Sequence, residues 1–79
     1  VPIAAMKHWH NAYGAELISL KDDSAEFYVG RPPQSKEAAM QLAREHFIYC
    51  PDTVAQGAGS LGKLAGRLFQ AHFWNFWWD

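Results

Sequence analysis

Hydrophobic residues recur at the spacing of an α-helix near the start of the chain: Met6, Trp9 and Tyr13. Gly14 follows them, at the place where a helix commonly ends in a residue of left-handed conformation. The pattern therefore predicts a short helix over residues 3–13.

Two runs of β-prone residues, 15–21 and 24–30, come next and are separated by Asp22-Asp23, which is typical of a β-hairpin. One register gives the hairpin an apolar face and a mostly polar face, as a half-buried hairpin requires. In that register three pairs of residues lie opposite each other: Leu20 with Ala25, Ile18 with Phe27, and Glu16 with Val29.

Pro32 and Pro33 stop the second strand, because proline cannot donate a hydrogen bond to a β-ladder. Ser35 then suits the N-cap of a second helix, which Pro51 ends. We expect one stripe of this helix to face the core. The residues of the stripe are Ala39, Leu42, Ala43, His46, Phe47 and Cys50.

After Pro51 the pattern predicts two further helical segments. Asp52 can cap a short turn over residues 53–55, before glycines at positions 57 and 59 interrupt it. Ser60 can cap a last helix, in which the residues expected to face the core repeat at intervals of three and four: Leu61, Leu64, Ala65, Leu68, Phe69 and His72.

The run over residues 73–78 is apolar at every position except Asn75, which predicts a central strand covered on both faces. Trp77 and Trp78 should then lie on opposite faces. The complete order is helix, two strands, helix, short helix, helix and strand. This order predicts the α+β class: one small two-layer domain over residues 1–79, with a mainly antiparallel sheet and helices packed on it.

Length and charge restrict the function further. A chain of 79 residues has one core and no room for a separate cofactor domain, so we expect no cofactor. The net charge of −1 argues against nucleic acid or an anionic membrane as a partner. A single cysteine cannot form an internal disulfide, and no run approaches the ~20 apolar residues that span a bilayer. Since the start also lacks the pattern of a signal peptide, we expect a cytoplasmic setting.

The segment over residues 57–63, Gly-Ala-Gly-Ser-Leu-Gly-Lys, has the glycine spacing of loops that bind dinucleotides or phosphate. Such a loop follows a strand, and a phosphate loop ends in Ser or Thr, whereas here a helical turn precedes it and Leu64 follows the lysine. We therefore interpret the glycines as breakers before a helix. A weaker alternative is an anion site at the start of the last helix, formed by Ser60 and Lys63.

His46 and Cys50 lie four residues apart on one helix face, a spacing that suits two metal ligands, and His72 or Asp52 could supply a third. The same pair could form a nucleophile and its base, but no spacing indicates a third orienting residue or an oxyanion site. We favour a core interpretation, with His46 partly buried and Cys50 a small buried side chain. No metal ligand and no catalytic residue is assigned.

Several short motifs stand in the order and spacing of a known family: Tyr13-Gly14-Ala15-Glu16, Arg31-Pro32-Pro33, Tyr49-Cys50-Pro51-Asp52, Gln56-Gly57 and Trp74-Asn75-Phe76-Trp77-Trp78-Asp79. From about Met6 to its last residue the chain resembles the bacterial DUF4253 domain, a family of unknown function. Asn75 departs from the pattern, since an aromatic residue is expected there. The resemblance implies no activity, and members of the family carry this region at the C-terminal end of a longer chain.

The resemblance implies a location for a site, because its polar signature positions lie at the ends of predicted elements. If the sheet gathers them, they form a small pocket for a ligand or a hydrolase-like reaction. Alternatively their roles are structural, with a helix cap and an ion pair between an arginine and a carboxylate. These positions are Arg31, Asp52, Gln56 and Asp79.

Together these features predict a non-catalytic binding or protein-interaction module, with a protein or a small ligand as partner and a homodimer as one arrangement. The alternative is a small-ligand or hydrolase-like site at the four polar positions, so enzymatic activity is left open. An exposed apolar patch or a self-association interface would favour the first function. A concave pocket that holds at least two of the polar groups would favour the second.

Overall fold

The computed structural model describes residues 3–51 and 60–78. In chain order its elements are α1 (Ile3–Tyr13), β1 (Ala15–Leu20), β2 (Ser24–Val29), α2 (Lys36–Tyr49), α3 (Leu61–Leu68) and β3 (Phe73–Trp77). The predicted α+β class is confirmed, and none of these helices is long and apolar enough to cross a membrane. The short helix predicted over residues 53–55 and the glycines at positions 57 and 59 lie outside the described residues.

Local capping chemistry bounds the helices. Gly14 follows α1 with a φ of 67°, a backbone region that glycine enters without strain. At the start of α2, Ser35 Oγ accepts a hydrogen bond from Ala38 N at 3.1 Å. At the start of α3, Ser60 Oγ accepts one from Lys63 N at 3.2 Å. The caps predicted at these three positions are thereby confirmed.

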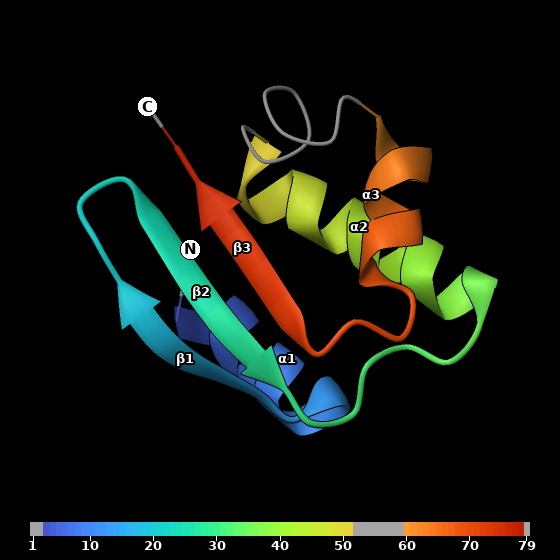
Figure 1. Ribbon diagram of the computed structural model, residues 1–79, viewed down its shortest axis with the longest axis horizontal. Helices are drawn as coiled ribbons and strands as arrows, with labels where there is room; N and C mark the ends of the chain where they lie inside the picture. The colour runs from blue at the N-terminus through green and yellow to red at the C-terminus, as the bar shows by residue number, and fades with distance from the viewer. Residues whose placement is uncertain (1–2, 52–59, 79) are drawn as a thin grey trace.

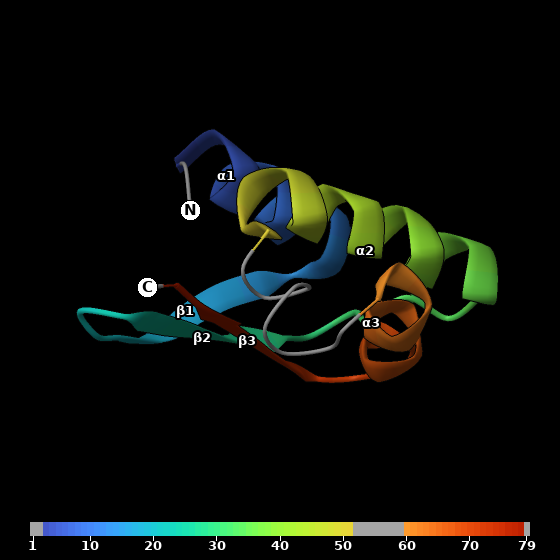
Figure 2. The ribbon, with the colours of Figure 1, turned by 90° about the horizontal axis from the view of Figure 1, so that it is seen from above.

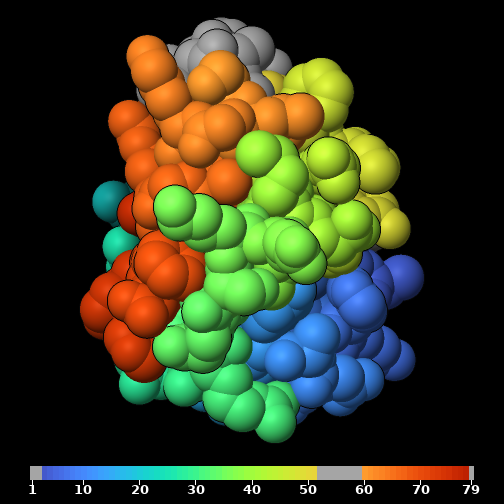
Figure 3. Space-filling view, turned by 90° about the vertical axis from the view of Figure 1, so that its right-hand side faces the viewer, coloured from blue at the N-terminus to red at the C-terminus, as the bar shows by residue number. Residues whose placement is uncertain are grey.

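The strands form an antiparallel sheet in the order β1-β2-β3, so β2 lies in the middle (Figure 1). Helices α1 and α2 lie over one face of the sheet, and α3 lies beside α2 past the end of the strands (Figure 2). The segment that follows β2 lies against the segment that precedes β3 (Figure 3), where Gln70 N donates to Pro33 O at 2.9 Å. This contact joins the two segments that connect the sheet to α2 and α3.

The prediction of a central last strand covered on both faces is wrong. In the described sheet β3 pairs with β2 alone and lies at an edge. Trp74 and Phe76 are buried, whereas Phe73 is 56% exposed and Asn75 is exposed. The reason is that the helices lie over one face of the sheet only, so the alternate residues of β3 face outward although most of them are aromatic.

The open face of the sheet carries a small aromatic group. Tyr28 lies opposite Phe73, with ring centroids 5.6 Å apart, and stacks on His72 at 6.1 Å. Trp77 lies farther along the same face, whereas Trp78 packs against the core. The prediction that these two tryptophans lie on opposite faces is therefore confirmed.

The register of the hairpin departs from the predicted one in its second half. Leu20 pairs with Ala25 as predicted, but a β-bulge between Leu17 and Ser19 then shifts the pairing by one residue. The two other predicted pairs are wrong because the bulge adds one residue to β1 that has no counterpart on β2. The pairs that replace them are Leu17 with Phe27, Glu16 with Tyr28, and Ala15 with Val29.

The core is built from aromatic side chains that come from distant parts of the chain. Trp9 of α1 stacks on Phe76 at 5.6 Å and meets Trp74 edge to face at 5.7 Å. Each such pair contributes about 0.5–1.5 kcal/mol beyond the burial of its area. The predicted stripe of α2 faces this cluster, with the exception of Phe47, which is 45% exposed because it lies one position round the helix from buried His46.

Candidate functional site

Arg31 belongs to the predicted polar cluster and lies where β2 ends. Its Nη2 donates to the backbone oxygen of Asn11 at 2.9 Å, and its backbone N donates to Tyr13 O at 2.8 Å. These bonds fasten the end of α1 to the end of β2, which is a structural role. The other members of the cluster lie outside the described residues, so the cluster and its ion pair stay predictions: Asp52, Gln56 and Asp79.

Ser60 and Lys63, the predicted anion site, form the start of α3. The hydroxyl of Ser60 accepts the hydrogen bond of Lys63 N, which is one of the free amides that an anion would use. The Lys63 residue itself is exposed. A helix cap accounts for the pair, and an anion site there stays a prediction.

His46 lies at the centre of the aromatic core, whereas the sequence placed it only partly in the core. Its ring centroid is 4.9 Å from that of Trp9, 4.8 Å from that of Trp74 and 4.6 Å from that of Phe76. The residue is 1% exposed, and this burial lowers the pKa of the imidazole to about 3. At neutral pH His46 is therefore an uncharged part of the core.

The metal-site alternative requires a third ligand close to His46 and Cys50. His72 was one candidate, but it lies beyond the end of α3, and its Nδ1 is 2.8 Å from Val29 O. The other candidate, Asp52, lies outside the described residues. Within residues 3–51 and 60–78, no three His, Cys, Asp or Glu side chains gather in a group that could hold a metal ion.

Cys50 should react slowly with thiol reagents while the protein is folded. The side chain is 6% exposed, and its Sγ donates to Trp77 O at 3.6 Å. Since the thiol becomes accessible only when the structure opens, we expect labelling by a maleimide to be at least about a hundredfold slower than in the urea-unfolded chain. A rate near that of the unfolded chain would contradict this burial.

A hydrogen-bonded carboxylate joins α1 to α2. Glu45 Oε1 accepts from Trp9 Nε1 at 2.9 Å and lies 3.3 Å from His8 Nε2, while Gln41 Nε2 donates to Oε2 at 3.3 Å. Burial, and then the negative charge of Glu45, raise the pKa of Tyr13. Nothing in the spacing of Glu45 distinguishes it from its neighbours on the helix. Because its contacts are internal, we interpret this cluster as a joint between the helices.

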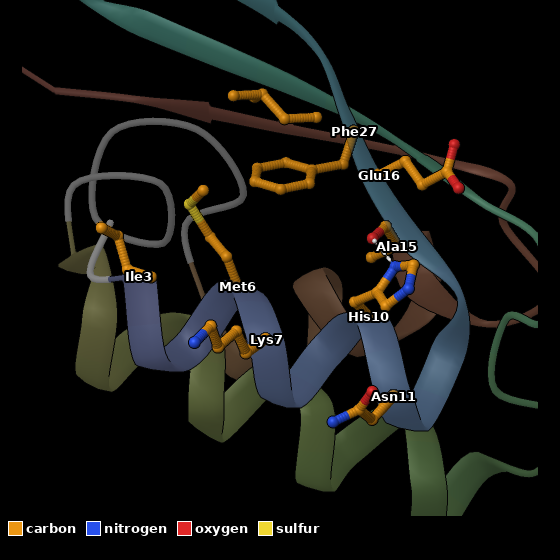
Figure 4. Close-up of a pocket in the computed structure, with 9 residues that line it drawn as sticks. Ile3, Met6, Lys7, His10, Asn11, Ala15, Glu16 and Phe27 are labelled. Carbon is orange, nitrogen blue, oxygen red and sulfur yellow. Dashed lines mark hydrogen bonds between the residues drawn. The ribbon is translucent and has the colours of Figure 1, made fainter.

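An apolar groove lies between α1 and the hairpin. Its larger part has a volume of about 470 Å³, and a second hollow of about 170 Å³ continues it toward the hairpin turn. Met6 and Phe27 point toward each other across the floor (Figure 4). We call the two hollows together the edge groove. The residues that define it are Ile3, Met6, Leu17, Leu20, Phe27 and Trp78.

Polar side chains stand around the mouth of the edge groove, from Lys7 and His10 on α1 and from Glu16 on β1. The Nδ1 atom of His10 lies 3.1 Å from Ala15 O, within hydrogen-bonding distance (Figure 4). The carboxylate of Glu16 points away from the hollow. An apolar floor with polar groups at the rim suits the binding of apolar side chains.

The strand beside the edge groove exposes apolar side chains. Leu17, Ile18 and Leu20 are 40%, 51% and 67% exposed. The only signal for this surface in the sequence is that three apolar residues stand within four positions of β1, more than an alternating strand can bury on one face. The predicted register placed Ile18 against the core, and the bulge exposes it instead.

A comparison with protein families supports the resemblance carried by the motifs. The model of the family described as "Domain of unknown function (DUF4253)" matches residues 1–79. No curated protein and no solved structure gave a match.

Proposed function

The chain belongs to the DUF4253 family, and we propose that it acts as a non-catalytic protein-interaction module. Its binding surface is the edge groove together with the adjoining free edge of β1. The observation that carries this proposal is that an apolar groove of about 470 Å³ runs beside a strand with three exposed apolar side chains.

An extended protein segment fits this surface. No described strand pairs with the outer side of β1. A segment that adds to such an edge gains backbone hydrogen bonds, while alternate side chains enter neighbouring pockets and give specificity. The edge groove supplies apolar pockets directly beside β1.

The chemistry at the groove supports binding rather than catalysis. Among the described residues that line it, His10 is engaged by the Ala15 carbonyl, and the carboxylate of Glu16 points away from the hollow (Figure 4). General acid–base catalysis needs ionisable groups aimed at the bound molecule. The arrangement of these two residues therefore favours a binding site.

Selection from a library of short random peptides tests the proposal. We expect the selected peptides to be rich in alternating apolar residues. They should bind at least about tenfold more weakly to Leu20→Lys, because that change places a charge at a position that the bound peptide covers. Phe73→Lys is the matched control, since Phe73 has a similar exposure of 56% on the open face of the sheet. It should change the affinity less than about twofold. Peptides that bind both variants equally, or failure of a monomeric chain to select any peptide, would contradict the proposal.

A further inference from the structure

The hydrogen bonds of β2 determine which backbone groups of β1 face its free edge. Val29 N donates to His72 O at 2.7 Å, so the backbone of Val29 faces β3. Lys21 N donates to Ser24 O at 2.8 Å, so the backbone of Ser24 faces β1. Successive strand residues direct their backbone groups to opposite sides. The β1 partners of Ala25, Phe27 and Val29 therefore turn theirs to the free edge: Leu20, Leu17 and Ala15.

Two of these residues are open to a further strand. At Ala15 the carbonyl is engaged by Nδ1 of His10 at 3.1 Å. Leu17 and Leu20 are three positions apart, yet the bulge between them places both on the core-facing side of the sheet, opposite Phe27 and Ala25. The edge thus offers two leucines whose backbone donors and acceptors point outward.

We propose that the strand bound at this edge is β1 of a second copy of the chain, so that two copies form a symmetric dimer; this proposal rests on the interaction function proposed above. The two β1 strands pair antiparallel, with Leu17 of one copy opposite Leu20 of the other, and the twofold axis repeats the pair. Because both leucines direct N–H and C=O at the partner strand, each pair exchanges both backbone hydrogen bonds. The three strands of each copy then join in one continuous sheet.

The same register brings opposite charges together. With Leu17 opposite Leu20, antiparallel pairing sets Glu16 opposite Lys21 of the second copy, again twice by symmetry. A shifted register with Leu17 opposite Ala15 of the second copy would also keep the core-facing sides of the two sheets aligned. It would require backbone hydrogen bonds from Ala15, whose carbonyl is already engaged by His10. A symmetric interface must be complementary to itself. A strand with an acidic residue near its start and a basic residue directly after its end meets this condition, which favours a second copy over an unrelated segment.

Apolar burial favours the same edge. Leu17 and Leu20 are 40% and 67% exposed, and the dimer covers each with a leucine of the other copy at the mouth of the edge groove. The opposite edge of the sheet is already engaged in part, because Cys50 Sγ donates to Trp77 O at 3.6 Å. Trp77 lies opposite Ser24, whose backbone groups point toward β1. The backbone groups of Trp77 therefore point away from β2, to the outer edge of β3.

Sedimentation equilibrium of the purified chain over a wide concentration range tests the dimer. We expect reversible dimerisation, with a dissociation constant that Leu20→Lys raises at least about tenfold and that Phe73→Lys changes less than about twofold. Glu16→Lys and Lys21→Glu should each raise it about three- to tenfold, because like charges then meet at both ends of the interface. The double variant Glu16→Lys/Lys21→Glu should return it to within about twofold of the unaltered chain. Circular dichroism verifies that each variant is folded.

The charge exchange reports on the register, since Glu16 and Lys21 meet only across the twofold axis. A dimer that tolerates Leu20→Lys, or that the double variant fails to restore, would overturn the proposal. A monomer at every concentration that still binds the selected peptides through Leu20 would overturn the dimer and leave the interaction module standing. A monomer that binds no peptide would overturn both.

Discussion

Trp74→Ala is expected to lower the free energy of unfolding by about 3–5 kcal/mol, which is much of the stability of a domain of this size. Trp74 is 1% exposed, and its ring contacts those of Trp9, Phe27 and His46 at centroid distances of 5.7, 6.4 and 4.8 Å. Truncation removes this apolar burial and leaves a cavity between the layers. Urea denaturation followed by circular dichroism measures the effect without relying on tryptophan fluorescence.

Phe73→Ala is the matched control, because Phe73 precedes Trp74 in β3 and faces the other side of the sheet. It is 56% exposed and contacts Tyr28 on the open face, so we expect a loss below about 1 kcal/mol. Equal losses for the two variants would mean that both faces of β3 are covered, and would contradict the layer arrangement of the structure.

Stability should also fall steeply with acid because of His46. A free histidine has a pKa of about 6.5, whereas burial lowers the pKa of His46 to about 3 in the folded state. Between these pH values the unfolded chain binds a proton that the folded chain rejects, so the folded state loses up to about 1.4 kcal/mol per pH unit. The contribution of uncharged His46 to the free energy of unfolding is complete above pH 6.5 and is lost progressively as the pH falls toward 3. The total loss is roughly 5 kcal/mol.

His46→Leu separates this effect from the titration of carboxylates. Leucine is apolar and of similar size, so the variant should remain folded at neutral pH while its stability changes much less between about pH 6.5 and 4.5. Urea midpoints measured across this range give the two slopes. If the variant and the unaltered chain lose stability equally, His46 does not titrate on unfolding and its burial is not the cause.

Three helix boundaries were predictable because they depend on neighbouring residues, whereas the last helix, expected to include His72, ends at Leu68. A serine hydroxyl caps the helix that begins beside it, so Ser35 and Ser60 indicate the starts of α2 and α3 without knowledge of the fold. Gly14 similarly marks the end of α1 through its own backbone conformation, with a φ of 67°. These signals place the helices along the chain, and the strands between them were predicted from their own apolar patterns.

The arrangement of the strands depends on contacts that the local pattern does not contain. A run such as residues 73–77, apolar at every position except Asn75, is compatible with a central or an edge strand, and only its partners decide which it becomes. The bulge after Leu17 likewise interrupts the alternation on which the predicted register relied. The edge groove could not be predicted either, since one of its walls is β1, whose exposed side is decided by the bulge.

The depth of His46 was not predictable from its helix. The stripe on α2 shows that it faces the core, but three aromatic rings from α1 and β3 enclose it: Trp9, Trp74 and Phe76. For the polar cluster, spacing correctly places Arg31 at the end of β2, and the structure adds a bond to Asn11 that no motif indicates.

The position of β3 in the sheet affects how the protein folds during its synthesis on the ribosome. A nascent chain emerges from its N-terminus, so α1, the hairpin and α2 leave the exit tunnel before Trp74 and Phe76. Until β3 arrives, the middle strand of the finished sheet is itself an edge, and Trp9 and Phe27 lack the rings that cover them. An open strand edge beside uncovered aromatic rings promotes aggregation and chaperone binding. Folding therefore cannot proceed stepwise along the emerging chain, because the core closes only when the last described strand is free to dock.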